Sequence, residues 1–148
     1  MTLSRRQLFV HGGLASAALA CPFPRIALAA EEDAAAREPA ELYLRGHATG
    51  AAEFFRQAFH PEARLYWIKD GQLASRTSAE YIAGAKGSPA DDEARRRRRI
   101  VSLDVTNDAA VAKIDLDYPD RHLVDYLALL KIEGRWKIVN KIFTSLPR

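Results

Sequence analysis

The sequence predicts a single α+β domain, with helices in its first half and an antiparallel sheet in its second half. Apolar residues recur at helical spacing before residue 60, whereas beyond residue 97 they alternate with polar residues as in strands. Two turn signals, Asn107-Asp108 and Glu133-Gly134, divide the second stretch into hairpins. With 148 residues, the chain is long enough for one domain with a core and too short for two.

The composition is that of a globular protein, because 48% of the residues are hydrophobic and 28% are charged. The formal net charge of +3 comes from Arg5, Arg6 and Arg25, which lie in an N-terminal segment without Asp or Glu. Without these three, the basic residues balance the 19 acidic ones. Overall charge therefore argues against binding to nucleic acid or to an anionic membrane surface.

The first 29 residues have the features of a twin-arginine signal peptide. The arginines at positions 5 and 6 precede a short apolar segment over residues 8–20, and an Ala-Leu-Ala triplet ending at Ala29 suits cleavage. We therefore expect a periplasmic or secreted protein. The apolar segment falls short of the ~20 residues that a membrane span needs, so we expect no stable span. Lipidation at Cys21 stays open. Cleavage after Ala29 would leave no cysteine for a disulfide.

Two helices are expected before residue 60. Residues 30–38 are charged and rich in alanine, which indicates a flexible lead-in to the domain at 39–146. Pro39 suits the first turn of a helix that we expect to end near Gly46. The apolar residues of 51–59 indicate a second helix, which is ended by a His-Pro pair.

A strand and a short helix follow. Residues 63–68 are rich in aromatic and branched side chains, and positions 70–71 form an Asp-Gly turn signal. Thr77 and Glu80 have the spacing of a capping box, which predicts a short helix that continues to about Ala85.

The first hairpin signal sets a strand register. If Asn107-Asp108 is a two-residue loop, Thr106 lies opposite Ala109. One face is then wholly apolar, while Ser102, Asp104, Lys113, Asp115 and Asp117 share the other. The apolar face is expected to carry Val101, Leu103, Val105, Ala110, Ala112, Ile114 and Leu116.

The second hairpin signal pairs Lys131 with Trp136 in the same way. Continued along the strands, this register places Asp125 and Asn140 on the inward face. The reverse face is too apolar for a solvated sheet surface, which predicts a homodimer contact. Its expected members include Tyr126, Val139 and Phe143.

Three strings of residues, in this order along the chain, resemble the nuclear transport factor 2-like superfamily. They lie at 43–50, 59–63 and 134–141, and they are similar to the branch labelled putative lumazine-binding. The resemblance implies a cone-shaped fold, in which N-terminal helices pack on a curved, mainly antiparallel sheet around one internal pocket. The superfamily includes ketosteroid isomerases, polyketide cyclases, dehydratases and non-catalytic binding domains, so the resemblance leaves the activity open.

Asp125 and His47 are the candidate proton acceptors. A carboxylate on the inward face that meets Asn140 diagonally would suit proton abstraction with support for an oxyanion. The alternative is that this pair only holds strand ends together. Histidine has an unperturbed pKa near neutral pH, which makes His47 a candidate base. It lies one helical turn after Tyr43 and could instead cap or pack against the helix. The side chain of Tyr118 is also expected on the inward face of the sheet.

Five consecutive arginines occupy positions 95–99, and some of them could bind an acidic ligand. Arg97 and Arg99 share the direction of Val101 and are expected at the pocket rim, where they would favour an acidic small molecule. Asp115 and Asp117 are expected outside, with Arg98 opposite Asp117.

The sequence favours an exported binding or assembly domain for an unknown small ligand, because no acid–base pair is enforced by spacing. The alternative is a cofactor-free lyase or isomerase that uses Asp125 or His47 as its base. We expect no metal and no cofactor, because His60 reads as a helix-closing residue and His122 lacks neighbouring ligands. The expected ligand contacts are Tyr43, His47, Trp67, Arg99, Tyr118, Asp125, Trp136 and Asn140.

Overall fold

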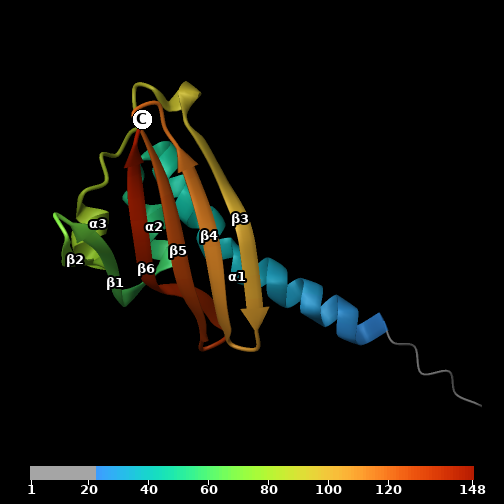
Figure 1. The fold of residues 1–148 in the computed structure, drawn as a ribbon. Coiled ribbons are helices and arrows are strands. Elements are labelled where there is room, and N and C mark those ends of the chain that lie inside the picture. Colours follow the sequence, from blue (N-terminus) through green and yellow to red (C-terminus); the bar gives the residue numbers. More distant parts are fainter. Residues whose placement is uncertain (1–22) are drawn as a thin grey trace, which may run out of the picture.

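A computed structural model describes residues 23–148 and confirms the α+β class (Figure 1). The helices lie on one face of a single sheet, and the other face is uncovered by any element of the described chain. The helical segments are α1 (Phe23–Thr49), α2 (Ala52–Ala58), α3 (Ser78–Ala83) and the short 3-10 turn η1 (Glu93–Arg95).

Six strands form the sheet, in the order β2-β1-β6-β5-β4-β3. Neighbouring strands are antiparallel except for β1 and β6, which are parallel. The strands are β1 (Phe59–Lys69), β2 (Gln72–Thr77), β3 (Arg97–Thr106), β4 (Ala109–Asp117), β5 (Arg121–Ile132) and β6 (Arg135–Pro147).

The first helix is longer than the sequence predicts. It begins at Phe23 rather than at Pro39, so residues 30–38, expected as a flexible lead-in, are helical. Ala36, Ala40 and Tyr43 are fully buried at helical spacing, and this packing stabilises a helix that contains an internal proline. The N-terminal part of α1 extends past the sheet (Figure 1). Most of the expected signal peptide, residues 1–22, lies outside the described residues.

The short elements agree better with the sequence. The second helix and the turn at 70–71 lie where they were expected, and Thr77 and Glu80 form the predicted capping box. The unpredicted strand β2 is a mostly exposed edge strand, which explains why it lacks a buried apolar pattern. Within residues 23–148, no helix is both long enough and apolar enough to cross a membrane.

The register of the first hairpin is confirmed near its turn and wrong beyond it. Thr106 pairs with Ala109 as expected, but a bulge between Ile100 and Ser102 inserts one residue in β3. Val101, expected inside, is therefore 44% exposed. The bulge reverses the arginine run as well, so that Arg98 rather than Arg97 or Arg99 lies opposite the buried Leu116.

A second bulge changes the inner face of β6. Lys131 pairs with Trp136 as expected, but the register shifts after Leu129, where β6 contains Val139 as an extra residue. Beyond this point Leu127 pairs with Lys141. The expected inward position of Asn140 is therefore wrong, and Lys141 lies inside instead.

The core lies between the helices and the concave face of the sheet. Its largest fully buried apolar side chains come from α1, β1 and the three central strands, and they surround a few buried polar groups. These side chains are Tyr43, Leu65, Ile114, Leu116, Leu127, Leu129 and Ile138.

Candidate functional site

A pocket of about 230 Å³ opens beside the C-terminal end of α1. His47 of α1, Tyr81 of α3 and Arg96 contribute its polar wall, and Phe55 of α2 contributes an apolar wall. The volume is below the roughly 300–1,000 Å³ of drug-sized ligand sites, so it suits a small molecule. Gly46, Gly50, Gly84, Ala85, Lys86, Ser88 and Ala90 complete the lining.

Two glycines of the lining allow close packing. A side chain at Gly46 would lie 2.6 Å from the Phe55 ring, and one at Gly50 would lie 2.1 Å from the carbonyl oxygen of Ser88. Gly50 also has a φ of +70°, which favours glycine. Its carbonyl accepts a hydrogen bond from the Gly87 amide at 2.9 Å. These contacts attach the loop at the pocket rim to the end of α1.

The imidazole of His47 lies between two tyrosine hydroxyls. Its Nε2 is 2.8 Å from the hydroxyl of Tyr81, and its Nδ1 is 3.3 Å from the hydroxyl of Tyr118. Burial, together with the positive charges of Lys141, Arg98 and Arg96, holds the pKa of His47 well below its usual range. The ring is therefore neutral at pH 7, and one of its two nitrogens carries no proton.

Behind this wall lies a buried cluster of Tyr43, Asp125 and Lys141. The Tyr43 hydroxyl donates to Asp125 Oδ2 at 2.5 Å and accepts from Lys141 Nζ at 2.5 Å. Lys141 Nζ also lies 3.1 Å from Asp125 Oδ2. Asp125 and Tyr43 are fully buried and Lys141 is 3% exposed. Asp125 Oδ1 has no hydrogen-bond partner among the described residues.

Burial changes the acidity of the groups in this cluster. Desolvation, the nearby Tyr81 and the charge of Asp125 raise the pKa of Tyr43 well above its usual range. Desolvation lowers the pKa of Lys141, and the attraction of Asp125 offsets this effect only in part. The lysine ammonium also lies over three aromatic rings, with centroid distances of 5.0 Å to Tyr43, 5.2 Å to Tyr81 and 4.5 Å to Phe143.

The hydroxyls join the pocket to the cluster. Tyr81 reaches the Tyr43 hydroxyl at 3.5 Å, which is the longest link between His47 and Asp125. Two sets of proton positions satisfy the same distances. Tyr81 can donate to His47 Nε2 while His47 Nδ1 donates to Tyr118, or Tyr118 can donate to Nδ1 while Nε2 donates to Tyr81, whose proton then points to Tyr43. A change of His47 tautomer therefore reverses the hydrogen bonds at the imidazole, whereas Tyr43 donates to Asp125 in both cases.

Arg98, not Arg99, is the inward arginine. Its guanidinium binds Glu93 through two contacts of 2.5 and 2.7 Å, and its Nε donates to the Tyr118 hydroxyl at 3.0 Å. This arrangement fixes the tyrosine that contacts His47. Arg99 is 70% exposed at its side chain and pairs with Asp115 on the outer face, so its expected place at the pocket rim is wrong. The same bulge in β3 accounts for the exchange.

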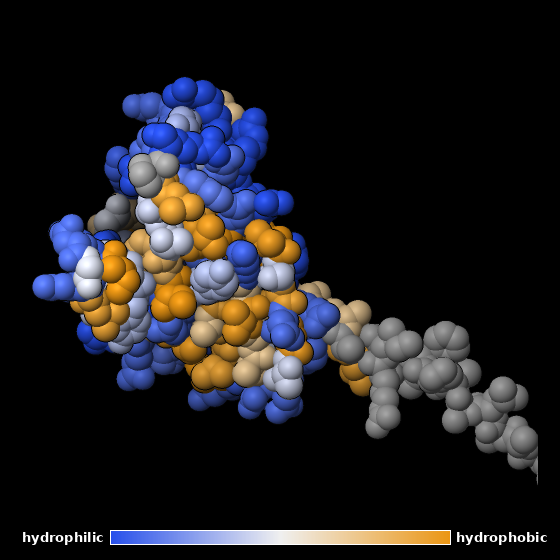
Figure 2. Space-filling view, viewed as in Figure 1, coloured by the Kyte–Doolittle hydropathy of each residue, from blue (hydrophilic) through white to orange (hydrophobic). Residues whose placement is uncertain are grey.

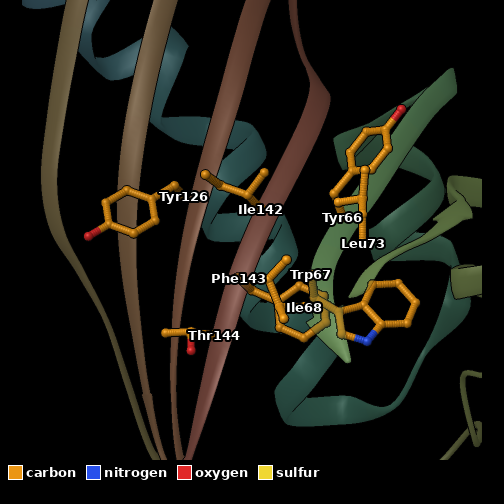
Figure 3. A pocket seen from close by; sticks show the side chains of 8 residues that line it. All are labelled: Tyr66, Trp67, Ile68, Leu73, Tyr126, Ile142, Phe143 and Thr144. Carbon is orange, nitrogen blue, oxygen red and sulfur yellow. The ribbon is translucent and has the colours of Figure 1, made fainter. Parts of the chain in front are cut away.

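The structure brings together four of the expected ligand contacts, Tyr43, His47, Tyr118 and Asp125, and places the others elsewhere. Asn140 donates to the Arg64 carbonyl at 3.2 Å rather than meeting Asp125. Trp67 stacks on Phe143, with ring centroids 5.4 Å apart, at a separate apolar pocket of about 320 Å³ (Figure 3). Trp136 is buried near the turn between β5 and β6.

Sequence reasoning missed Lys141 and Tyr81. Alternation alone places Lys141 outside, and only the bulge turns it inward. Tyr81 belongs to a short helix whose inner face carries too few residues to show a period. The capping box at Thr77 could have indicated the position of Tyr81 on this helix, because the box fixes the residue at which the helix begins.

The fold and the site define an α+β protein of the nuclear transport factor 2-like type. A structure from Shewanella baltica OS155, described as an NTF2-like protein of unknown function, has a TM-score of 0.72 and 25% identity, with 80% of this chain and 97% of the other covered. A second such structure, from Silicibacter pomeroyi DSS-3, has a TM-score of 0.69 and 23% identity, with coverages of 80% and 98%.

The family model described as putative lumazine-binding matches residues 31–144, so the chain belongs to this family. A curated relative, the aldolase FrzH of a Cladobotryum species, is 25% identical over 109 residues. That match covers 74% of this chain and 87% of the relative. The predicted superfamily and branch are thus confirmed.

Proposed function

We propose that this protein is an acid–base enzyme of lyase or isomerase type that acts on a small carbonyl compound bound beside His47. The observation that carries the proposal is the neutral imidazole in the pocket wall, with the Tyr81 hydroxyl 2.8 Å from its Nε2. A proton acceptor and a hydroxyl donor on the same wall are the two groups that such chemistry needs.

The geometry supports a simple sequence of proton movements. If the carbonyl oxygen of the substrate accepts the hydrogen bond of the Tyr81 hydroxyl, Tyr81 no longer donates to Nε2 of His47. The free nitrogen then accepts a proton from the carbon next to the carbonyl, while Tyr81 stabilises the negative charge that develops on oxygen. The Tyr43 hydroxyl, 3.5 Å from that of Tyr81, connects this donor to the buried Asp125.

The aldolase relative supports the same class of chemistry. An aldol reaction removes a proton from the carbon beside one carbonyl and delivers a proton to the oxygen of a second one. FrzH is named for such an activity, and its match to this chain covers 87% of its length. The resemblance supports carbonyl chemistry without naming the substrate of this chain.

Deuterium exchange tests this proposal without knowledge of the substrate. In D₂O the protein is expected to speed exchange at the α-carbons of simple ketones such as acetone, cyclohexanone or acetophenone, as followed by proton NMR. His47→Gln should slow the protein-dependent exchange by about 10²–10⁴-fold, and Tyr81→Phe by about 10²-fold. His122→Gln, which changes a histidine paired with Asp115 on the other face, is the matched control.

Two outcomes would contradict the proposal. Exchange that persists in His47→Gln would assign the base elsewhere. Wild-type protein that speeds exchange of none of the ketones, yet retains a small molecule in native mass spectrometry, would favour the second candidate, a non-catalytic binding protein. That candidate is supported by the way Tyr43, Asp125 and Lys141 already bind one another, as in a structural network.

We also propose that the protein is exported and forms a homodimer. Export is supported by the paired arginines and the Ala-Leu-Ala triplet of the N-terminal segment. Intact mass spectrometry of protein from the periplasm would support export if the mass corresponds to a chain that begins at residue 30.

The dimer is supported by the uncovered outer face of the sheet, where Figure 2 shows apolar residues gathered. Phe143 stacks on Trp67 beside Lys141, so Ile142 replaces it in the expected interface.

Ile142→Lys is expected to convert the dimer to a monomer. Ile142 is 51% exposed, and it lies opposite Tyr126 on the outer face, near Ile68 and Leu73. An ammonium group buried between two such faces would lack a partner. Light scattering should show half the mass of the wild type, while Glu53→Lys in α2 should leave the mass unchanged. An unchanged mass of the Ile142 variant would exclude this interface.

A further inference from the structure

We propose that Lys141 is a nucleophile, and that its amine forms an imine with an aldehyde or ketone that enters the site beside His47. The inference rests on the proposed function and names a covalent step for it. It begins from an unusual placement: Lys141 is 3% exposed, and its Nζ lies within 3.1 Å of both the Asp125 carboxylate and the Tyr43 hydroxyl.

The surroundings of the amine shift its protonation equilibrium toward the neutral, reactive form. Aromatic rings of Tyr43, Tyr81 and Phe143 enclose it, so the ammonium loses most of its hydration. This desolvation lowers the pKa of Lys141 despite the neighbouring carboxylate. The same combination of an apolar enclosure and a nearby acid–base group activates lysines that form imines in proteins.

The neighbours of Lys141 supply the proton transfers that an imine needs. Asp125 accepts a proton from the ammonium, and the nitrogen lone pair then attacks the carbonyl carbon. A second proton passes from the nitrogen to the former carbonyl oxygen, which gives a neutral carbinolamine. The proton on Asp125 then passes through the Tyr43 hydroxyl to the carbinolamine hydroxyl, which leaves as water as the carbon–nitrogen double bond forms. One carbonyl compound and one lysine ammonium thus give one protonated imine and one water, Asp125 and Tyr43 are restored, and neither oxidant nor reductant takes part.

A free acceptor atom lies where this chemistry would use it. Asp125 Oδ1 is buried and has no hydrogen-bond partner among residues 23–148, although Oδ2 of the same carboxylate has two. A carbinolamine hydroxyl, or the departing water, would donate to Oδ1.

One aromatic side chain contacts both the amine and the pocket. Tyr81 lines the pocket, and its ring centroid is 5.2 Å from Lys141 Nζ. Tyr81 is held by hydrogen bonds of its hydroxyl to His47 and Tyr43, of which the second is long. A carbonyl oxygen that binds the Tyr81 hydroxyl would compete with these contacts and let the ring move aside. The entering carbonyl carbon would then face Lys141.

Reductive trapping tests the proposal on the intact protein. Acetone and sodium cyanoborohydride at pH 7 convert an imine to a stable isopropyl amine, which peptide mass spectrometry locates. Acetone should modify Lys141 faster than the five other lysines, by about tenfold for each unit by which its pKa is lowered. Those five, Lys69, Lys86, Lys113, Lys131 and Lys137, are internal controls. The double variant Lys141→Met with Asp125→Asn, which removes both charges together, should lose the fast reaction.

Each outcome decides the matter. Fast modification at Lys141 supports the proposal, and loss of deuterium exchange from the ketone in the double variant would connect it to the proposed function. Slow modification spread over the exposed lysines, with Lys141 unchanged, would overturn it and leave Lys141 as a structural cation. Deuterium exchange that depends on His47 while Lys141 stays unmodified would overturn the imine alone.

Discussion

Replacing Lys141 with Met should lower the free energy of unfolding by about 3–5 kcal/mol, because it leaves the charge of Asp125 buried without its partner. Asp125 is fully buried, and of its contacts only the Tyr43 hydroxyl would remain. Urea denaturation followed by circular dichroism gives the change. Met has nearly the length of Lys, so a cavity contributes little to the effect.

Two matched variants separate charge from packing in this result. Lys137→Met removes a lysine of the same strand whose Nζ hydrogen-bonds, within residues 23–148, only to the carbonyl of Gln57, and it should cost less than about 1 kcal/mol. The double variant with Asp125→Asn removes both charges, and it should recover at least half of the loss. A single variant as stable as the wild type would contradict the expected cost of an unpaired buried carboxylate.

Acidification should destabilise the protein before its carboxylates titrate. Unfolded His47 gains a proton as the pH falls below its usual pKa near 6.5, whereas folded His47 stays neutral because its pKa is well below that value. The unfolded state therefore binds more protons in this window, and stability falls with pH. The loss should reach about 2 kcal/mol between pH 7 and pH 5.

The groups around His47 explain why the folded ring resists a proton. Arg96 and Arg98 on the β3 side and Lys141 of β6 repel positive charge, while Tyr81 and Tyr118 occupy both ring nitrogens. His47→Gln should remove this part of the pH dependence, and His122→Gln should retain it. Denaturant unfolding at closely spaced pH values makes the comparison. Equal slopes for the wild type and His47→Gln would contradict a neutral His47.

The turn residues were the main basis on which the sequence predicted how the strands of the sheet pair. Asn107 and Glu133 adopt positive φ values of 56° and 49° in the two predicted hairpins, and the pairs beside both turns were assigned correctly. The family strings added the fold. These signals are local, and each depends only on a few neighbouring residues.

The inward residues were predictable only as far as the first irregularity in each strand. The bulges near Val101 and Val139 each insert one residue, and nothing in the local sequence distinguishes these valines from ordinary strand residues. Asp125 precedes the shift on a strand without an insertion, and its inward position was predicted correctly. Arg98 was assigned to the wrong face, and alternation would assign Lys141 to the wrong face as well, because both lie beyond an insertion. Their positions depend on tertiary packing, which alternation does not report.

The bulge at Val139 also changes how relatives of this protein should be compared. In a chain without that extra residue, the side chain at the aligned position of Lys141 would face solvent, and its neighbour would occupy the interior. An alignment that closes the gap a few positions away would make a shared buried lysine look like a substitution, or a surface lysine look like a match. Whether a homologue retains the interior amine therefore depends on the backbone hydrogen bonds of its strands. These should be established before the aligned residues are compared.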